Sequence, residues 1–275
     1  MTAFPPFAQV TDDQMRRYAK IIYDVAGIEI SAAKKQLLSN RIRRRLKETG
    51  IKDFEAYYSF LKSTPTSHAE WDFFLQEVTT HETYLFRDEM NWRWLRECFL
   101  PEIQKSGSST LRVWSAACST GDEAYSVACC IADGLRNTAQ WRVQILGTDI
   151  GVGAVQEAQQ AYFAERAMRL VPADWKKRYF KQLGEAAIWE PVDRLRSLTR
   201  FRQHNLLDRL VEAPFDLVFL KNVLIYFNQQ SKQHVIKNIE PVMRPGSYLI
   251  AGAAEGISDL MQGFERVHPW LYRRK

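Results

Sequence analysis

Residues 111–149 read LRVWSAACSTGDEAYSVACCIADGLRNTAQWRVQILGTD, the pattern of a strand, a tight turn, a helix and a second strand. The two apolar runs, LRVWSAA (111–117) and VQILGT (143–148), are typical of buried strands. CSTGDE (118–123) is small and polar with one glycine, which favours a turn. EAYSVACCIADGL (123–135) has the length and composition of a helix. The stretch therefore predicts a βαβ unit of an α/β sheet.

Gly121 and Asp149 make this unit a candidate ligand site. Because Gly121 has no Cβ, backbone N–H groups at the turn can approach a ligand closely. Asp149 ends the second strand, where a carboxylate can accept both hydroxyls of a ribose. The turn holds one glycine and not the three of a full dinucleotide fingerprint, so an ordinary α/β domain with such a turn stays open as the alternative.

Length and composition exclude several classes of protein. The 275 residues suit one large or two ordinary domains, and 46% hydrophobic with 25% charged residues is typical of a globular protein. No apolar run approaches the ~20 residues that span a bilayer. MTAFPPFAQVTDD lacks the features of a signal peptide, so we expect a cytoplasmic protein. The four cysteines show no metal-ligand spacing, so we expect reduced thiols and no metal.

Residues 1–78 predict an all-α domain of four short helices. Helix-start signals lie at Thr11, Ser31, Asp53 and Ser67, with capping boxes at Thr11 and at Ser67–Glu70, and Gly27 and Gly50 close the first two helices. Apolar residues at helical spacing give each helix one buried face. We therefore expect a separate small helical core before residue 79.

The second of these helices, over residues 31–49, is strongly basic. Its basic residues are Lys34, Lys35, Arg41, Arg43, Arg44, Arg45 and Lys47, and Glu48 is the acid near them. Most charge runs are solvated helix faces. Here the like charges would repel one another, and the net charge of +6 permits an acidic partner. The run therefore favours a polyanionic partner, either a nucleic acid or an acidic helical protein.

Residues 79–275 continue the α/β pattern of strands and helices. FDLVFLKN (215–222) reads as another buried strand, and FERVHPWLYRR (264–274) reads as a closing antiparallel hairpin. Residues 183–203 alternate polar and apolar near their end, so we expect a small antiparallel β insert there. Ligands of such sheets lie at the carboxyl ends of the strands, which here carry residues 118–123, Asp149 and residues 221–226.

Four blocks in order resemble the CheR-type chemoreceptor glutamate methyltransferases of bacterial chemotaxis. TTHETYLFR (79–87) resembles the family's TTN-x-T-x-FFR, and VWSAACSTGDEAYS (113–126) resembles WSAA-x-STGEEPYS. LGTDI (146–150) resembles ATDI, and FLKNVLIYF (219–227) resembles FCRNVLIYF. The basic second helix followed by a Tyr-Tyr helix also matches the family's N-terminal domain.

The resemblance implies a fold, a reaction and a partner. The fold would be a Rossmann-like S-adenosylmethionine methyltransferase domain (79–275) with a small antiparallel β insert, preceded by an all-α N-terminal domain (1–78). The enzyme would transfer a methyl group from S-adenosylmethionine to glutamate carboxylates of a chemoreceptor and release S-adenosylhomocysteine. The basic helix would dock the acidic helical bundle of the receptor, with no nucleic acid partner and no membrane insertion, although receptor arrays could recruit the protein.

The resemblance also assigns residues. His81, Thr83, Arg87, Glu123, Asp149, Asn205, Leu206, Lys221 and Asn222 fall where the family binds the cofactor, and Arg87 and Tyr226 fall where it is thought to orient the substrate. Two positions depart from the pattern: His81 replaces the usual Asn, and Lys221 replaces the usual Arg. Lysine provides a point charge without a planar fork, so a bidentate contact would be lost there.

The implied chemistry needs positioning more than proton transfer. A glutamate with a pKa of about 4.3 is already ionised at neutral pH, so no general base is required. Arg87 can hold the substrate carboxylate, Tyr226 can donate to it, Asp149 can accept from the ribose, and Asn205 can contact the adenine edge. Without the family, Tyr226 reads as a packed core tyrosine.

Two other functions stay open from the sequence. An RNA methyltransferase would explain the basic helix, although no RNA-binding module and no Asn-Pro-Pro-aromatic motif is visible. A non-enzymatic adaptor that binds the cofactor would explain the changes at His81 and Lys221. Turnover on a receptor would distinguish the enzyme from the adaptor, and a salt-dependent RNA shift would favour the RNA enzyme.

Overall fold

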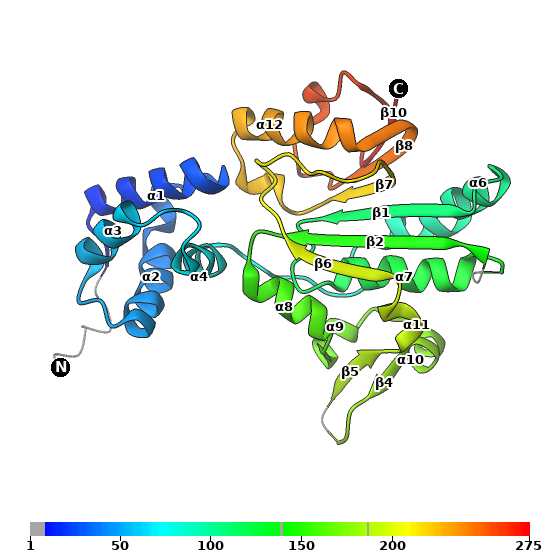
Figure 1. Cartoon of the computed structure of the whole chain (residues 1–275), viewed down its shortest axis with the longest axis horizontal. Coiled ribbons are helices and arrows are strands. Elements are labelled where there is room, and N and C mark those ends of the chain that lie inside the picture. Colours follow the sequence, from blue (N-terminus) through cyan, green and yellow to red (C-terminus); the bar gives the residue numbers. More distant parts are fainter. Residues whose placement is uncertain (1–8, 138–139, 186) are drawn as a thin grey trace.

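The computed structural model describes residues 9–137, 140–185 and 187–275. Four N-terminal helices lie beside a seven-stranded sheet that carries helices on both faces (Figure 1). A separate three-stranded sheet projects from this main sheet. The predicted fold class is confirmed: an all-α part precedes a Rossmann-like α/β part with a small antiparallel sheet.

The helices are α1 (Asp12–Ala26), α2 (Lys35–Thr49), α3 (Phe54–Ser63), α4 (Ala69–Val78), α5 (Glu89–Trp94), α6 (Leu100–Lys105), α7 (Asp122–Gly134), α8 (Val152–Gln160), α9 (Glu165–Met168), α10 (Ala173–Tyr179), α11 (Asp193–Arg196) and α12 (Gln229–Ile239). The strands are β1 (Thr110–Ala116), β2 (Arg142–Asp149), β3 (Phe163–Ala164), β4 (Phe180–Gln182), β5 (Ile188–Pro191), β6 (Thr199–Gln203), β7 (Phe215–Leu220), β8 (Met243–Ala251), β9 (Phe264–His268) and β10 (Leu271–Arg274). A π-helical turn (Leu95–Phe99) joins α5 to α6.

Helices α1 to α4 share one apolar core, which includes Tyr18, Ile42, Tyr57 and Phe74. The predicted capping box at the start of α1 is present, because Thr11 Oγ1 accepts from the Gln14 N–H at 3.1 Å and Gln14 accepts from the Thr11 N–H at 3.0 Å. The apolar faces predicted from helical spacing are the faces that meet in this core.

Two predicted helix starts in this part are wrong. Ser31 makes no capping hydrogen bond with its side chain; it precedes a 3₁₀ turn (Ala32–Lys34), and α2 begins at Lys35. The cap of α4 is His68, whose Nδ1 accepts from the Glu70 N–H at 3.1 Å, and not Ser67. Glu70 is buried within the helical core, so its carboxylate is not available for the predicted capping box.

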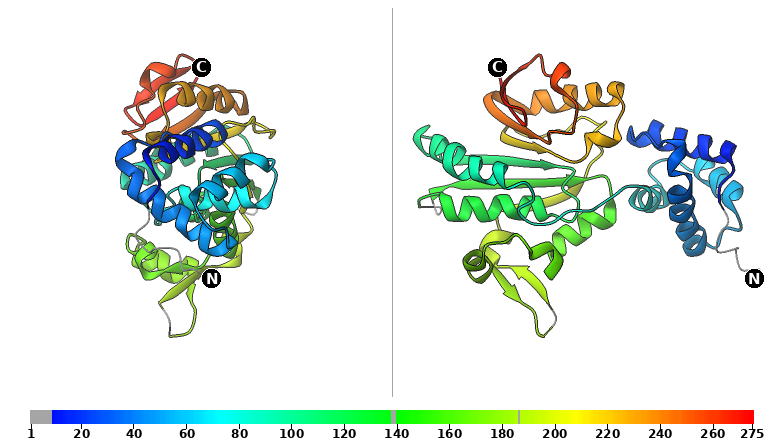
Figure 2. Two further views of the ribbon diagram at one scale, coloured as in Figure 1. Left: turned by 90° about the vertical axis from the view of Figure 1, so that its left-hand side faces the viewer. Right: turned by 180° about the vertical axis from the view of Figure 1, so that it is seen from behind.

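The main sheet has the order β6-β2-β1-β7-β8-β10-β9. Strands β6, β2, β1, β7 and β8 pair in parallel, and β10 pairs antiparallel with β8 and β9. The predicted parallel sheet with a closing antiparallel hairpin is therefore confirmed. The carboxyl ends of the parallel strands point toward the four N-terminal helices (Figures 1 and 2).

Alternate residues of the buried strands face two different cores. Leu217 and Phe219 of β7 belong to the core beneath α7, and Val218 and Leu220 belong to the core beneath α12. This alternation is the period of two that a strand covered on both faces requires. Strand β7 is therefore buried along its whole length.

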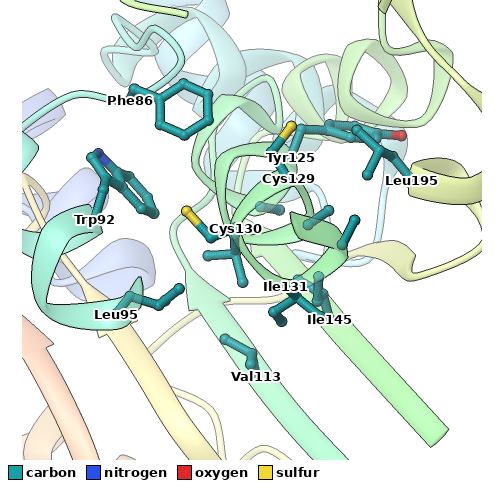
Figure 3. Close-up of a cluster of buried hydrophobic side chains, with 14 of the residues drawn as sticks. Phe86, Trp92, Leu95, Val113, Tyr125, Cys129, Cys130, Ile131, Ile145 and Leu195 are labelled. Carbon is teal, nitrogen blue, oxygen red and sulfur yellow. The ribbon is translucent and has the colours of Figure 1, made fainter. Parts of the chain in front are cut away.

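Two of the cysteines pack in the core beneath α7. Figure 3 shows Cys129 and Cys130 of this helix among apolar side chains such as Leu95 and Val113. Burial raises the pKa of both thiols. All four cysteines of the chain are free.

A small antiparallel sheet is present, but the predicted bounds of the β insert, residues 183–203, are wrong at both ends. The small antiparallel sheet has the order β3-β5-β4 and so spans residues 163–191. Strand β6 belongs to the main sheet, where it pairs in parallel with β2 from Ile145↔Thr199 to Asp149↔Gln203. The alternation of polar and apolar residues there reflects a half-exposed edge strand.

Within the described residues, no helix combines the length and the apolar character needed to span a lipid bilayer.

Candidate active site

One cavity lies between the N-terminal helices and the carboxyl ends of the sheet strands. Its volume is about 1330 Å³, including the part that is open to solvent. This is enough for a nucleoside-sized ligand. All ten predicted site residues line it: His81, Thr83, Arg87, Glu123, Asp149, Asn205, Leu206, Lys221, Asn222 and Tyr226. Segments far apart in sequence therefore meet around one space.

Asp149 is held at the end of β2 by two backbone donors. Its Oδ2 accepts from the Ser119 N–H at 2.8 Å, and its Oδ1 accepts from the Gly151 N–H at 2.9 Å. A carboxylate offers about four lone-pair positions, so each oxygen can still accept from a ligand hydroxyl. The geometry fixes the carboxylate without using up its capacity to accept.

The glycine of the turn has a different role from the one expected. Gly121 does not line the cavity, whereas Ala117, Cys118 and Ser119 do. Its φ is +88°, and a Cβ there would lie 2.9 Å from the Cβ of Ala158 on α8. Gly121 therefore allows the turn to pack against α8, and the residues that precede it face the cavity.

His81 connects the linker at 79–87 to the same turn. Its Nδ1 lies 3.7 Å from Asp149 Oδ1, and its Nε2 lies 2.6 Å from Thr79 Oγ1. The His81 carbonyl accepts from Ser119 Oγ at 2.9 Å. A Cβ at Gly151 would lie 2.6 Å from the imidazole ring, so glycine is needed where the linker passes β2. His81 therefore binds Ser119, whose N–H donates to Asp149, and so connects the linker to the end of β2.

Lys221 lies between two carboxylates at the wall of the cavity. Its Nζ is 2.9 Å from Asp88 Oδ2 and 3.9 Å from Glu123 Oε2, and its side chain is 2% exposed. The ammonium also lies 5.7 Å from the centre of the Trp92 ring. Glu123 accepts from Ser115 Oγ at 2.7 Å. Burial raises the pKa of Glu123, and Lys221 and Ser115 oppose that rise.

Arg87 reaches the cavity from the end of the linker. Its guanidinium donates to the Glu82 carbonyl at 3.4 Å and lies 5.7 Å from the centre of the Tyr84 ring. Among the described residues it makes no ion pair. The Arg87 carbonyl accepts from Trp92 Nε1 at 2.7 Å, which anchors the backbone there. Arg87 is therefore a cation at the cavity wall that can still receive a carboxylate.

The turn after β7 carries Asn222 and Tyr226. Asn222 has a φ of +57°, and Tyr226 ends a 3₁₀ turn (Leu224–Tyr226). The Tyr226 carbonyl accepts from the Glu29 N–H at 2.8 Å, next to an antiparallel bridge between Ile28 and Phe227. The loop after α1 thus attaches the helical part to this turn.

Asn205 makes hydrogen bonds within the protein through its side chain. Its Nδ2 donates to the Val25 carbonyl at 2.7 Å, and its Oδ1 accepts from the Leu207 N–H at 3.1 Å. One N–H of Nδ2 and one lone pair of Oδ1 stay available for a ligand such as an adenine edge. His204, its neighbour, has a buried Nε2 without a partner among the described residues, and burial lowers its pKa.

Acids from other helices reduce the repulsion expected among the basic residues at 34–47. Arg45 donates to Glu70 at 3.0 and 2.8 Å, and Glu70 also accepts from the Tyr57 hydroxyl at 2.5 Å. Arg44 pairs with Glu77 at 2.9 Å, and Lys35 pairs with Asp12 at 2.7 Å. The acids come from other helices, so the sequence around residues 34–47 did not reveal them. The basic residues exposed on this stretch are Lys34, Arg44 and Lys47.

Several residues of the site were not predicted. Lys34 and Arg41 of the basic stretch line the cavity, and Lys34 Nζ lies 5.5 Å from the centre of the Tyr226 ring. Asp88 pairs with Lys221, and Glu255 holds the turn at 222–225. An acid within the small and apolar run GAAEGI (252–257) was the available signal for Glu255.

Comparisons with known proteins agree with this arrangement. Residues 13–79 match the family model described as CheR methyltransferase, all-alpha domain, and residues 81–270 match CheR methyltransferase, SAM binding domain. The chemotaxis protein methyltransferase of Escherichia coli K12 is 32% identical over 259 residues, which is 93% of this chain and 88% of that protein. The chemotaxis protein methyltransferase of Borreliella burgdorferi is 29% identical over 272 residues, covering 96% and 95%.

A solved structure shows a weaker likeness. The N-methyltransferase NodS of Bradyrhizobium japonicum WM9, in complex with S-adenosylhomocysteine, is 14% identical with a TM-score of 0.39, and the match covers 66% of this chain and 87% of that one.

The cavity fits S-adenosylmethionine on its own chemistry. That molecule has ribose hydroxyls and a methionine ammonium, both hydrogen-bond donors, and the cavity presents two fixed carboxylates, Asp149 and Glu123. Leu206 and Ile150 supply apolar wall. The donors of the ligand and the acceptors of the site are therefore complementary.

Proposed function

The chain belongs to the CheR methyltransferase family and is an S-adenosylmethionine-dependent methyltransferase, and we propose that it methylates glutamate side-chain carboxylates of a bacterial chemoreceptor. The observation that carries this proposal is Arg87. It lines the cavity and makes no ion pair within the described residues, so it can receive an acceptor carboxylate. Lys221, the buried cation nearby, is already paired with Asp88.

The reaction then depends on position. S-adenosylmethionine supplies an electrophilic methyl group, and the glutamate is already an anion at neutral pH, so the protein has no proton to remove. Arg87 orients the carboxylate, and Tyr226 donates to it from the turn after β7. An Arg87 contact that held both oxygens too firmly would stabilise the ground state and slow the reaction. The contact that Arg87 makes with the Glu82 carbonyl, at 3.4 Å, is long for a hydrogen bond, so the guanidinium gives up little when it binds a carboxylate.

The cofactor is held by the remaining site residues in this proposal. Asp149 accepts from the ribose, and Glu123 accepts from the ammonium. His81 Nδ1 lies 3.7 Å from Asp149, and Lys221 Nζ lies 3.9 Å from Glu123. Thr83, Asn205, Leu206 and Asn222 complete the wall. Each of the two residues that depart from the family pattern therefore lies next to one of the two carboxylates.

The partner in this proposal is the acidic helical bundle of a chemoreceptor in the cytoplasm. Residues 1–78 act as its docking domain, and residues 79–275 act as the catalytic domain. The exposed basic residues are Lys34, Lys47 and Arg44, of which Arg44 also pairs with Glu77, and Lys34 also lines the cavity. Such docking weakens as salt rises.

The two alternatives are weaker than this proposal. RNA methylation was favoured by the basic helix, but Glu70, Glu77 and Asp12 neutralise part of that charge. A non-catalytic adaptor would explain a defective cavity, but Asp149 and Glu123 both line the cavity and both accept hydrogen bonds that hold them in place.

A comparison of acceptors tests the proposal. The purified protein is incubated with methyl-labelled S-adenosylmethionine and either a receptor cytoplasmic fragment, structured RNA or no acceptor. Label on the receptor fragment alone is the expected result. Label on RNA would favour the RNA enzyme, and binding of S-adenosylhomocysteine without transfer would favour the adaptor.

A further inference from the structure

Glu255 is a fully buried acid that lies outside the predicted site. It follows β8, and its exposed fraction is 0%. Its Oε1 accepts from the Asn222 N–H, and its Oε2 accepts from the Ile225 N–H at 3.1 Å. We propose that Glu255 is a positioning residue that holds the turn at 222–226 in its active form. The inference rests on the proposed function, because Asn222 and Tyr226 take their roles from it.

The turn needs such a support. Asn222 adopts a φ of +57°, a left-handed conformation that asparagine tolerates better than most residues with a side chain and that sets the direction of the turn. The turn leaves the β7 ladder at Leu220, so its N–H groups have no strand partner. A carboxylate that accepts two of these N–H groups satisfies them and fixes their direction.

The structure around Glu255 is built for this contact. A Cβ at Gly252 would lie 2.8 Å from Glu255 Oε1, so the chain after β8 needs glycine to bring the carboxylate beneath the turn. Burial raises the pKa of Glu255, and the backbone N–H groups of Asn222, Leu224 and Ile225 oppose that rise. These N–H groups stabilise the ionised form, which is the better acceptor.

The turn is also attached on its other side. The Tyr226 carbonyl accepts from the Glu29 N–H, and Phe227 bridges Ile28. Glu255 therefore fixes the start of the turn, and the loop after α1 fixes its end. A shift of about 1 Å in a positioning group can cost on the order of 10²-fold in rate.

A matched control separates this role from stability. Asp216 lies on β7 at the end away from the cavity, is also buried, and also accepts a backbone N–H, from Arg112 at 2.8 Å. Glu255→Gln and Asp216→Asn each replace one carboxylate oxygen with an amide that cannot accept. Both should lower the melting temperature.

Turnover and backbone exchange give the decisive readouts. For Glu255→Gln we expect kcat on receptor to fall by on the order of 10-fold or more. The affinity for S-adenosylhomocysteine should fall by a smaller factor, through Asn222, and receptor KM should change far less. Asp216→Asn should keep kcat within about twofold of wild type. Hydrogen exchange at the Asn222 and Ile225 amides should accelerate in Glu255→Gln and not in Asp216→Asn.

A second variant keeps the test decisive if Glu255→Gln does not fold. Gly252→Ala retains the charge and displaces the carboxylate, so it should lower kcat and accelerate the same amides. Wild-type kcat and unchanged exchange in the folded variants would overturn the inference. If the wild-type enzyme did not methylate receptor at all, the proposed function would fail, and the exchange comparison alone would decide whether Glu255 holds the turn.

Discussion

Arg45 should be a stability residue and not a docking residue, although it lies in the middle of the basic helix. Its side chain is 12% exposed, that of Glu70 is 8% exposed, and two hydrogen bonds join them. Removing one member of a buried ion pair leaves an uncompensated charge, which costs about 3–5 kcal/mol. Arg45→Ala would leave Glu70 with the Tyr57 hydroxyl as its remaining partner in this triad.

The size of the effect follows from this cost. A loss of about 3–5 kcal/mol lowers the melting temperature by roughly 6–20 °C for a chain of this size class. Arg44→Ala is the matched control, because Arg44 is 66% exposed and its pair with Glu77 is worth at most about 1 kcal/mol. Thermal denaturation by circular dichroism measures both variants under the same conditions.

A double variant tests the reason for the loss. Arg45→Met combined with Glu70→Gln removes both charges and leaves an oxygen for the Tyr57 hydroxyl, so it should recover most of the stability that Arg45→Ala loses. Equal melting temperatures for Arg45→Ala and Arg44→Ala would refute the reasoning, and so would a double variant no more stable than Arg45→Ala.

Three further predictions concern the site and its pH dependence. Asp149→Asn should weaken S-adenosylhomocysteine binding by about 1–3 kcal/mol, because an amide replaces an acceptor oxygen; calorimetric titration measures this, and unchanged affinity would remove Asp149 from the site. Arg87→Ala should lower kcat far more than cofactor affinity; an equal loss in both would make it a cofactor residue alone. Burial raises the pKa of Asp122 to about 6 from its ordinary value of 3.8. Below pH ~4 the Asp122 carboxyl is protonated in both the folded and the unfolded state, and above pH ~6 it is ionised in both. As the pH rises between these values, the free energy of unfolding should therefore fall by on the order of 3 kcal/mol. Urea denaturation should show that Asp122→Asn flattens this fall, and an unchanged profile would contradict the assignment.

The sequence predicted the architecture of the sheet because its signals are local. Apolar runs marked β1, β2 and β7, and a small polar turn marked the start of α7. The ends of parallel strands meet at one edge of a sheet, so residues as distant as Asp149 and Asn222 could be expected in one place. The motif resemblance then supplied His81, Thr83 and Arg87 of the linker, and these three residues line the cavity.

The parts that could not be predicted depend on contacts between distant segments. The alternation in β6 is the same for an edge strand of the main sheet as for an insert, and the pairing with β2 decides between them. The acids that neutralise the basic helix lie 23 to 33 residues away along the chain. Glu255 and Asn222 are hydrogen-bonded although 33 positions separate them in the sequence. Periodicity and spacing carry no information about such partners.

Chemical identification of the methylated group tests the central claim most directly. The receptor fragment is incubated with the protein and S-adenosylmethionine, digested and mapped by mass spectrometry, before and after mild alkali. The account predicts methyl esters on glutamate side chains that alkali removes. Methyl groups on other atoms, or an unmodified receptor with a protein that binds S-adenosylhomocysteine, would contradict it.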